Sequence, residues 1–143
     1  PAFKSITVMV QREVADRLVA VPRTKDYGRL SVLTQFLAKP RRLFDVPPRA
    51  FVPPPKVTSS VVELIPLPAP AAPARIEDLE RVTQAAFGQR RKMLRQSLRS
   101  LGVEEVEDLL AAADIAPTSR AEELTVAQFA ALARTLRARR EPT

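Results

Sequence analysis

The chain has 143 residues, of which 45% are hydrophobic, so it is long enough to bury a core and is not a wholly disordered protein. It contains neither cysteine nor histidine, which excludes disulfide staples, thiolate zinc sites and Ser-His catalysis. The formal net charge of +7 favours an anionic partner, and nucleic acid leads that class.

The N-terminal sequence PAFKSITVMVQREV has no basic leader followed by an apolar core, and no apolar run reaches the ~18 residues that a membrane span needs. We therefore expect a soluble, cytoplasmic protein with no membrane partner and no metal.

The first half predicts an α/β unit. Phe3 to Val10 alternate and are rich in β-branched residues, which predicts a strand, and Gln11 to Val21 have helical spacing. A second helix is expected within Tyr27 to Leu37. Arg42 to Val46 and Ser60 to Ile65 read as strands, and the proline-rich connection between them would join an antiparallel pair at a sheet edge.

The second half predicts helices. Residues 66–74, PLPAPAAPA, carry four prolines and no charge, which is typical of a semi-rigid spacer. We divide the chain into residues 1–66, a linker at 67–74 and a helical domain at 75–143. The expected helices are 76–87, 90–101, 103–113 and 125–139. Helix starts are indicated by the capping-box pairs Thr125 with Gln128 and Ser119 with Glu122.

A basic cluster lies in the segment RRKMLRQSLR. Five cations and no acidic residue occur between Ala85 and Ser100. On a continuous helix Arg91, Arg95 and Arg99 would form a cationic ridge beside an apolar stripe, and arginine pairs well with phosphate oxygens. A solvated charged face is the competing interpretation. The predicted RNA-binding residues are Arg90, Arg91, Lys92, Arg95, Arg99, Lys56 and Arg29.

Phe51 lies in the segment AFVPPPKV, whose prolines restrict the backbone around it. Three consecutive prolines, Pro53 to Pro55, exclude a helix or a central strand, so Phe51 is held on a rigid loop. Three roles remain open at this point. Phe51 is a core anchor, part of a proline-rich ligand for an aromatic groove, or a stacking surface for a base removed from its helix.

The chain lacks a recognisable cofactor loop. Its three glycines form no G-x-G pattern that would bring the backbone close to a nucleotide or sulfonium cofactor. Glu13 and Asp16 are the nearest approach to a catalytic carboxylate pair, but Arg12 and Arg17 beside them favour surface ion pairs.

Four blocks together resemble one known family. MVQREVADRLVA (9–20), KDYGRLSVLTQF (25–36), LFDVPPRAFVPPPKVTSSVVEL (43–64) and AFGQRRKMLRQSL (86–98) are similar, in the same order, to the later part of the bacterial small-subunit ribosomal RNA adenine N6,N6-dimethyltransferases, the kasugamycin-resistance methyltransferases. The erythromycin-resistance methylases share mainly the block around Phe51. The GRLSV and QRRK blocks favour the housekeeping family.

The resemblance implies an α/β fold class, the end of a Rossmann-like methyltransferase sheet with a terminal β-hairpin, followed by a small all-α C-terminal domain. Phe3 to Val10 would be a late strand of the parallel sheet and 42–65 the hairpin. Members dimethylate N6 of two adjacent adenosines near the 3′ end of 16S rRNA, with S-adenosylmethionine as cofactor and the small ribosomal subunit as partner. Phe51 matches the aromatic residue that stacks on the flipped adenine.

Three family motifs do not occur in the chain: the glycine-rich cofactor loop, the acidic residue for the cofactor ribose and the Asn-Leu-Pro-Tyr motif. The resemblance therefore implies a C-terminal fragment that is inactive alone and binds no cofactor by itself. Thr58 stands where the family usually has Asp. A truncated sheet would expose an edge and an apolar face, so we expect self-association.

Two other functions remain in competition with this interpretation. One is a non-catalytic RNA-binding or ribosome-assembly module that kept the fold without the chemistry. The other is a proline-rich adaptor whose binding through residues 47–55 would be indifferent to salt.

Overall fold

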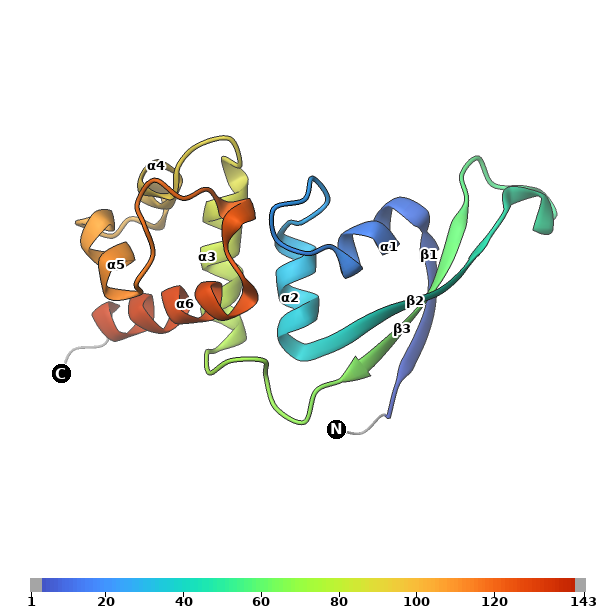
Figure 1. The fold of residues 1–143 in the computed structure, drawn as a ribbon, viewed down its shortest axis with the longest axis horizontal. Helices are drawn as coiled ribbons and strands as arrows, with labels where there is room; N and C mark the ends of the chain where they lie inside the picture. The colour runs from blue at the N-terminus through green and yellow to red at the C-terminus, as the bar shows by residue number, and fades with distance from the viewer. Residues whose placement is uncertain (1–3, 141–143) are drawn as a thin grey trace.

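The computed structural model describes residues 4–140, with the strands at one end of the long axis and most of the helices at the other (Figure 1). The strands are β1 (Ile6–Gln11), β2 (Ala38–Val46) and β3 (Ser59–Pro66). The α-helices are α1 (Arg12–Val19), α2 (Arg29–Leu37), α3 (Ile76–Gly88), α4 (Leu94–Ser97), α5 (Val106–Ala112) and α6 (Val126–Arg140). Short 3-10 turns are η1 (Pro48–Ala50), η2 (Leu98–Leu101) and η3 (Ala121–Glu123).

The sheet has the order β1-β3-β2, and both neighbouring pairs are antiparallel. Val62 of β3 lies opposite Val8 of β1, and Val61 lies opposite Phe44 of β2, beyond a register shift between Arg42 and Phe44. The expected β2–β3 hairpin is confirmed, and β2 begins earlier than predicted, at Ala38. The parallel pairing implied for the first strand is absent within residues 4–140, and Phe3 lies outside them.

One face of the sheet is covered and the other is not. Because side chains alternate along a strand, Val62 points to the face on which α1 packs, where it meets Ala15 and Leu18. On the opposite face Met9 and Phe44 are 56% and 57% exposed. The sheet end therefore has a small core and a large apolar surface.

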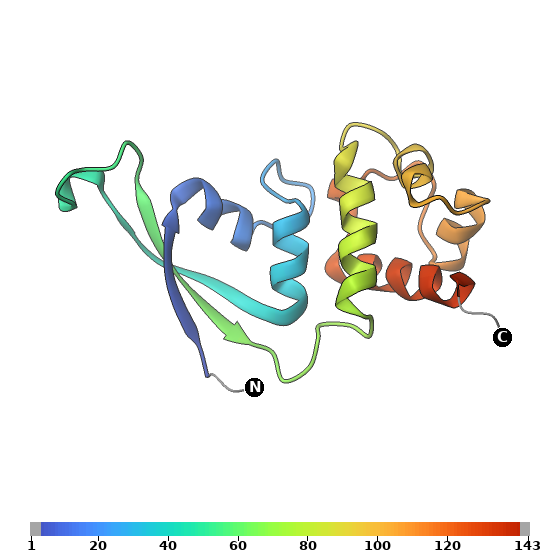
Figure 2. The same ribbon diagram turned by 180° about the vertical axis from the view of Figure 1, so that it is seen from behind.

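The main core lies among the helices and includes α2. Tyr27, Phe36 and Phe129 are buried in the same cluster as the leucines of α3, α4 and α5. In Figure 2, α2 stands between the sheet and α3. Residues 67–74 contain neither helix nor strand, but the buried cluster continues across them because α2, which precedes the linker, packs against α3 and α6.

The linker is fastened rather than loose. The amides of Leu67 and Ala71 donate to the carbonyls of Leu37 and Phe36, at 2.9 Å each. Arg134 of α6 donates to the carbonyl of Pro73 at 2.5 Å. The proline-rich spacer thus runs along the end of α2 to the start of α3.

The predicted continuous helix at 90–101 is wrong. Residues 89–93 form a turn, α4 starts only at Leu94, and η2 follows it. The reason is a partner far along the chain: the amide of Leu94 donates to Ser119 at 2.8 Å, and Met93 forms an isolated antiparallel bridge with Arg120. These contacts take donors that a helix would have used. Consequently Arg91, Arg95 and Arg99 do not form a helical ridge.

Other helix boundaries follow local signals. The Thr125 capping box is confirmed, since Gln128 and Thr125 exchange side chain to backbone hydrogen bonds of 3.1 and 2.9 Å. The expected Ser119–Glu122 box lies one residue later, where the amide of Arg120 donates to Glu123 at 3.1 Å. The helix expected from 103 begins at Val106, because Gly102 (φ 73°) and Glu105 (φ 56°) have left-handed backbone.

Candidate nucleic-acid interface

The connection between β2 and β3, which carries Phe51, lies at the end of the molecule farthest from the C-terminal helices (Figure 1). η1 follows Pro47, and the amide of Phe51 donates to the carbonyl of Pro48 at 3.1 Å, which closes the turn. Phe51 itself is half-buried, whereas the next residue, Val52, is 98% exposed. Phe51 is therefore partly covered and partly accessible.

A hollow of about 460 Å³ lies beside this loop. One wall comes from the loop, through Pro48, Lys56 and Thr58, and the other from the start of α1. The backbone joins the two walls, because the amide of Arg12 donates to the carbonyl of Thr58 at 2.9 Å. Thr58 is half-buried in this hollow.

Ion pairs fix the wall contributed by α1. Asp16 pairs with Arg42 of β2, and Glu13 pairs with Arg17 at 2.6 Å. Asp45 accepts a 2.5 Å hydrogen bond from Ser60 and lies 3.8 Å from Arg12. The pair of Glu13 with Arg17 is as the sequence indicated, whereas Asp16 pairs with the distant Arg42 rather than with its neighbour Arg12.

Arg90 is held by contacts within the chain. Its guanidinium donates to the carbonyls of Tyr27 and Thr24 at 2.5 and 3.1 Å. It also lies 3.3 Å from a carboxylate oxygen of Glu122 and 5.8 Å from the ring centre of Phe87. Arg90 therefore fastens the turn that precedes α4 to the α1–α2 connection and to η3.

The loop before α2 is fastened from the other side as well. The buried hydroxyl of Tyr27 donates to the carbonyl of Leu124 at 2.7 Å, and burial raises the pKa of this phenol well above its usual value. The amide of Arg23 donates to Glu122 at 2.7 Å. The KDYGRL and FGQRRK blocks, far apart in sequence, thus meet in space.

The anchored turn exposes the next two cations. Arg91 and Lys92 are exposed, and the amide of Lys92 donates to the carbonyl of Gln89 at 2.9 Å. The Met93–Arg120 bridge places a further exposed arginine beside them. Sequence reasoning missed Arg120, because no local pattern connects it with the basic cluster.

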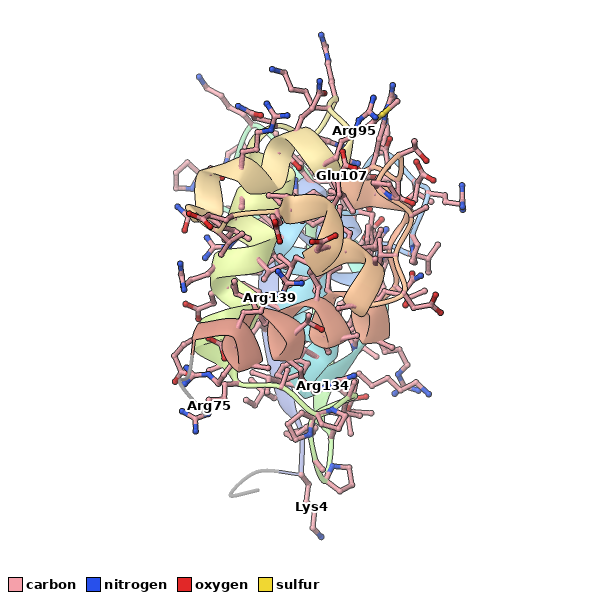
Figure 3. All side chains as sticks on the ribbon, turned by 90° about the vertical axis from the view of Figure 1, so that its left-hand side faces the viewer. Lys4, Arg75, Arg95, Glu107, Arg134 and Arg139 are labelled. Carbon is pink, nitrogen blue, oxygen red and sulfur yellow. The ribbon has the colours of Figure 1, made fainter. Side chains whose placement is uncertain are left out.

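Arg95 and Arg99 face an acidic wall. They line one hollow together with Glu105, Glu107 and Asp108. Asp108 raises the pKa of Glu105, first through a side-chain hydrogen bond and then through charge repulsion. In Figure 3, Arg95 and Glu107 lie near each other at one end of the helical region, whereas Arg75 and Arg134 lie at the other end.

The structure does not bring the predicted site residues into one cluster. In Figure 1 the loop carrying Phe51 and Lys56 lies at one end of the long axis, whereas the turn carrying Arg91 and Lys92 lies in the other half of the molecule, and both lie along the upper edge. Arg29, which precedes both segments in the sequence, is exposed at the start of α2, and α2 lies between them in Figure 1. An extended ligand, rather than a small one, is needed to reach both the loop and the turn.

Comparison with known proteins decides the family. Residues 1–138 match the ribosomal RNA adenine dimethylase family. The chain belongs to this family. It is 64% identical over 133 residues to ribosomal RNA small subunit methyltransferase A of Rhodospirillum rubrum, covering 93% of this chain and 46% of that protein. It is 62% identical over 138 residues to the protein of the same name from Paramagnetospirillum magneticum, covering 96% and 48%.

Two solved structures share the fold. The dimethyladenosine transferase from Plasmodium falciparum matches with a TM-score of 0.75 at 23% identity, over 91% of this chain and 56% of that one. The 23S rRNA methyltransferase ErmE matches with a TM-score of 0.60 at 26% identity, over 96% and 56%. The chain spans about half the length of the curated relatives it matches, namely the two bacterial methyltransferases above.

Neither a candidate metal cluster nor a helix that could span a membrane is found among the described residues. Within residues 4–140 no cluster of three or more acidic, histidine or cysteine side chains is placed to hold a metal ion. No helix in that range is long and apolar enough to cross a membrane. The chemically distinctive features are the closed turn that carries Phe51 and the turn at residues 89–93, which exposes Arg91 and Lys92 and is called the outward basic turn below.

Proposed function

We propose that this chain is the part of an S-adenosylmethionine-dependent rRNA adenine dimethyltransferase that docks 16S rRNA and supplies one wall of the target-base pocket. The reaction would place two methyl groups on N6 of each of two adjacent adenosines near the RNA 3′ end, in the cytoplasm. The observation that carries the proposal is the outward basic turn, Arg91 and Lys92, within a chain of this family.

The turn suits an RNA backbone for electrostatic reasons. Arg90 uses its guanidinium internally, so Arg91 and Lys92 are the cations of the QRRK block that point to solvent. Each phosphate neutralised by such a side chain releases condensed counterions, which makes binding favourable and salt-dependent. Because the turn is anchored, less conformational entropy is lost when RNA orders it.

The Phe51 loop suits a base. A half-buried phenylalanine whose backbone is held in a closed turn offers a stacking surface worth about 1–3 kcal/mol per base. The adjacent hollow of about 460 Å³ has room for an extruded base beside Thr58 and Lys56. An exocyclic amine conjugated to its ring is a poor nucleophile, so a wall that holds N6 in line contributes by orientation.

The described residues do not fit the cofactor. A glycine-rich cradle brings backbone close to the ligand, but a Cβ at Gly88 or Gly102 would meet open space, and at Gly28 the nearest atom is Nη1 of Arg90 at 3.7 Å. We therefore assign no methyl-transfer step to this chain alone, and place its strands at the end of a Rossmann-like sheet. Calorimetry of the isolated chain is expected to show no S-adenosylmethionine binding, and a micromolar affinity would overturn this assignment.

The direct test of RNA docking is titration with the 3′-terminal hairpin of 16S rRNA at several salt concentrations. A scrambled hairpin of equal length is the control. We expect tighter, salt-sensitive binding to the true hairpin, with a salt slope that falls by roughly 0.7 to 0.9 in Arg91→Ala. Equal binding to both hairpins with an unchanged slope in the variant would refute docking through this turn.

The uncovered sheet face leads us to propose self-association of the isolated chain. Met9 and Phe44 expose apolar surface, and within residues 4–140 no strand pairs with the outer edge of β1. Both features favour pairing with a second copy. Sedimentation velocity over a range of concentrations should show a dimer or larger species, and a monomer at all concentrations would contradict this proposal.

A further inference from the structure

A second hollow near the basic turn has no acidic residue in its lining, unlike the hollow that Arg95 and Arg99 share with Glu105, Glu107 and Asp108. It has a volume of about 280 Å³ and lies between the 89–93 turn and η2. Its lining residues are Gln89, Lys92, Gln96, Ser97, Arg99 and Ser100. Two are cations, four are neutral hydrogen-bonding residues, and none is acidic. This combination is typical of sites that bind an oxyanion.

Ser97 in this hollow is unusual. It is only 1% exposed, and its hydroxyl has no hydrogen-bond partner among residues 4–140. Its carbonyl is used, because Ser100 donates to it at 3.1 Å. A buried hydroxyl without a partner is unfavourable for the fold, so a hydroxyl kept at such a position indicates a partner from outside the chain.

The hollow on the other side of Arg99 provides the contrast. There Arg95 and Arg99 face Glu105, Glu107 and Asp108, so an anion would meet carboxylates. Arg99 lines both hollows, Lys92 lines only the acid-free one, and Arg95 lines only the acid-lined one. The charge of the walls therefore separates cations that the sequence alone groups together.

We propose that the hollow lined by Lys92, Ser97 and Arg99 seats one backbone phosphate of the bound RNA, an inference that rests on the proposed RNA-docking function. Arg99 and Lys92 neutralise the phosphate, and the Ser97 hydroxyl donates to one of its oxygens. Arg90 holds the turn that carries Lys92 through the Tyr27 and Thr24 carbonyls, so the hollow is formed before RNA arrives. Arg95 contributes less, because its field is balanced by the acidic wall.

The test is a titration of the chain with the 16S 3′ hairpin, comparing four single variants with the native sequence. Lys92→Ala and Arg99→Ala should each reduce the salt slope by about 0.7 to 0.9. Ser97→Ala should weaken binding by about 2- to 10-fold with an unchanged slope, because a neutral donor is lost. Arg75→Ala, an exposed arginine at the opposite end of the helical region in Figure 3, is the matched control.

Ser97→Ala separates binding from folding. Removing an unpartnered buried hydroxyl should leave the melting temperature unchanged or raise it, while RNA affinity falls. Native RNA affinity in this variant would overturn the phosphate site. If the native chain shows no preference for the true hairpin, the docking function itself fails, and that outcome is distinct from normal docking that is insensitive to Lys92, Ser97 and Arg99.

A second arm identifies the source of the phosphate. Inorganic phosphate titrated into the free chain should move the amide resonances of residues 96–100 only at millimolar concentrations, and RNA should move them at concentrations far lower. Saturation by inorganic phosphate at micromolar concentration would assign the hollow to a free anion and overturn the RNA assignment.

Discussion

The two ends of the molecule differ in how completely they are covered. The sheet end has a small cluster of three buried apolar residues within the described range, Ala15, Leu18 and Val62, and leaves Met9 and Phe44 more than half exposed. The helical end, including α2, encloses a continuous cluster that contains Phe36 and Phe129. Burial of apolar area is the main stabilising term, so the helical end should carry most of the stability. The sheet end should contribute less to stability and instead exposes apolar surface at Met9 and Phe44.

This difference assigns different tasks to the two ends. At the helical end Arg90 holds the basic turn in place by donating to the carbonyls of Tyr27 and Thr24. This anchoring requires that the segment carrying those carbonyls is itself well packed. The sheet end carries the Phe51 loop and an apolar face with no partner among residues 4–140.

Two phenylalanines give a matched test of burial. Phe129→Ala removes a fully buried ring and should lower the free energy of unfolding by about 3–5 kcal/mol. Phe44→Ala removes a ring that is 57% exposed, so its effect should stay within about 0.5 kcal/mol. Chemical denaturation followed by circular dichroism measures both. Equal losses would contradict the difference between the two ends.

The anchoring role of Arg90 can be tested by a conservative change. Arg90→Lys keeps the charge but loses the planar fork that reaches two carbonyls and Glu122, and should cost about 1–3 kcal/mol. Arg91→Lys, at the exposed neighbouring position, should change stability by less than about 0.5 kcal/mol. Thermal melts of the two variants decide, and an unaffected Arg90→Lys chain would show that the anchor contributes nothing to the fold.

Tyr27 allows a pH test, since it is the single tyrosine in a chain without tryptophan. Burial raises the pKa of Tyr27 in the folded chain above its ordinary value of 10.0, so this phenol loses its proton at lower pH in the unfolded chain than in the folded one. The stabilisation is therefore complete below about pH 10 and is lost as the pH rises toward the folded-state pKa. Tyrosinate absorbance should appear only together with unfolding, and Tyr27→Phe should flatten this alkaline limb. Tyrosinate formed in a fully folded chain would contradict the burial.

The smallest effect on stability is expected on the uncovered sheet face. Met9→Lys places a charge where the native side chain is 56% exposed, so stability should change by less than about 0.5 kcal/mol. Self-association should weaken, because the apolar patch is interrupted. Sedimentation velocity gives the measurement, with Lys4→Ala, at the exposed start of the chain's described part, as the control.

The fold was largely predictable where local signals decide it. The strands, the hairpin, α3 and α6 follow from alternation, helical spacing and the Thr125 capping box. The helix at 90–101 was not predictable, because the competing partner of Leu94 lies at Ser119. Local propensity is overridden when a distant segment takes the backbone donors.

The candidate site was predictable only in part, for the same reason. Sequence reasoning grouped Arg90 with Arg91 and Lys92, but the structure engages Arg90 with carbonyls more than 60 positions away. Arg120 comes beside the turn through the Met93 bridge, which no local pattern indicates. The RNA-binding roles of Phe51, Lys56, Arg29 and the remaining cations stay predictions.

The most direct test of the account maps the RNA contact surface. Amide resonances of the isotope-labelled chain would be followed during titration with the 16S 3′ hairpin. We expect perturbations at residues 89–100, around Arg120 and in the loop from Phe51 to Thr58, with little change at Met9 on the uncovered sheet face or in α6. Perturbations centred on the sheet face or on α6, with the 89–93 turn unaffected, would contradict it.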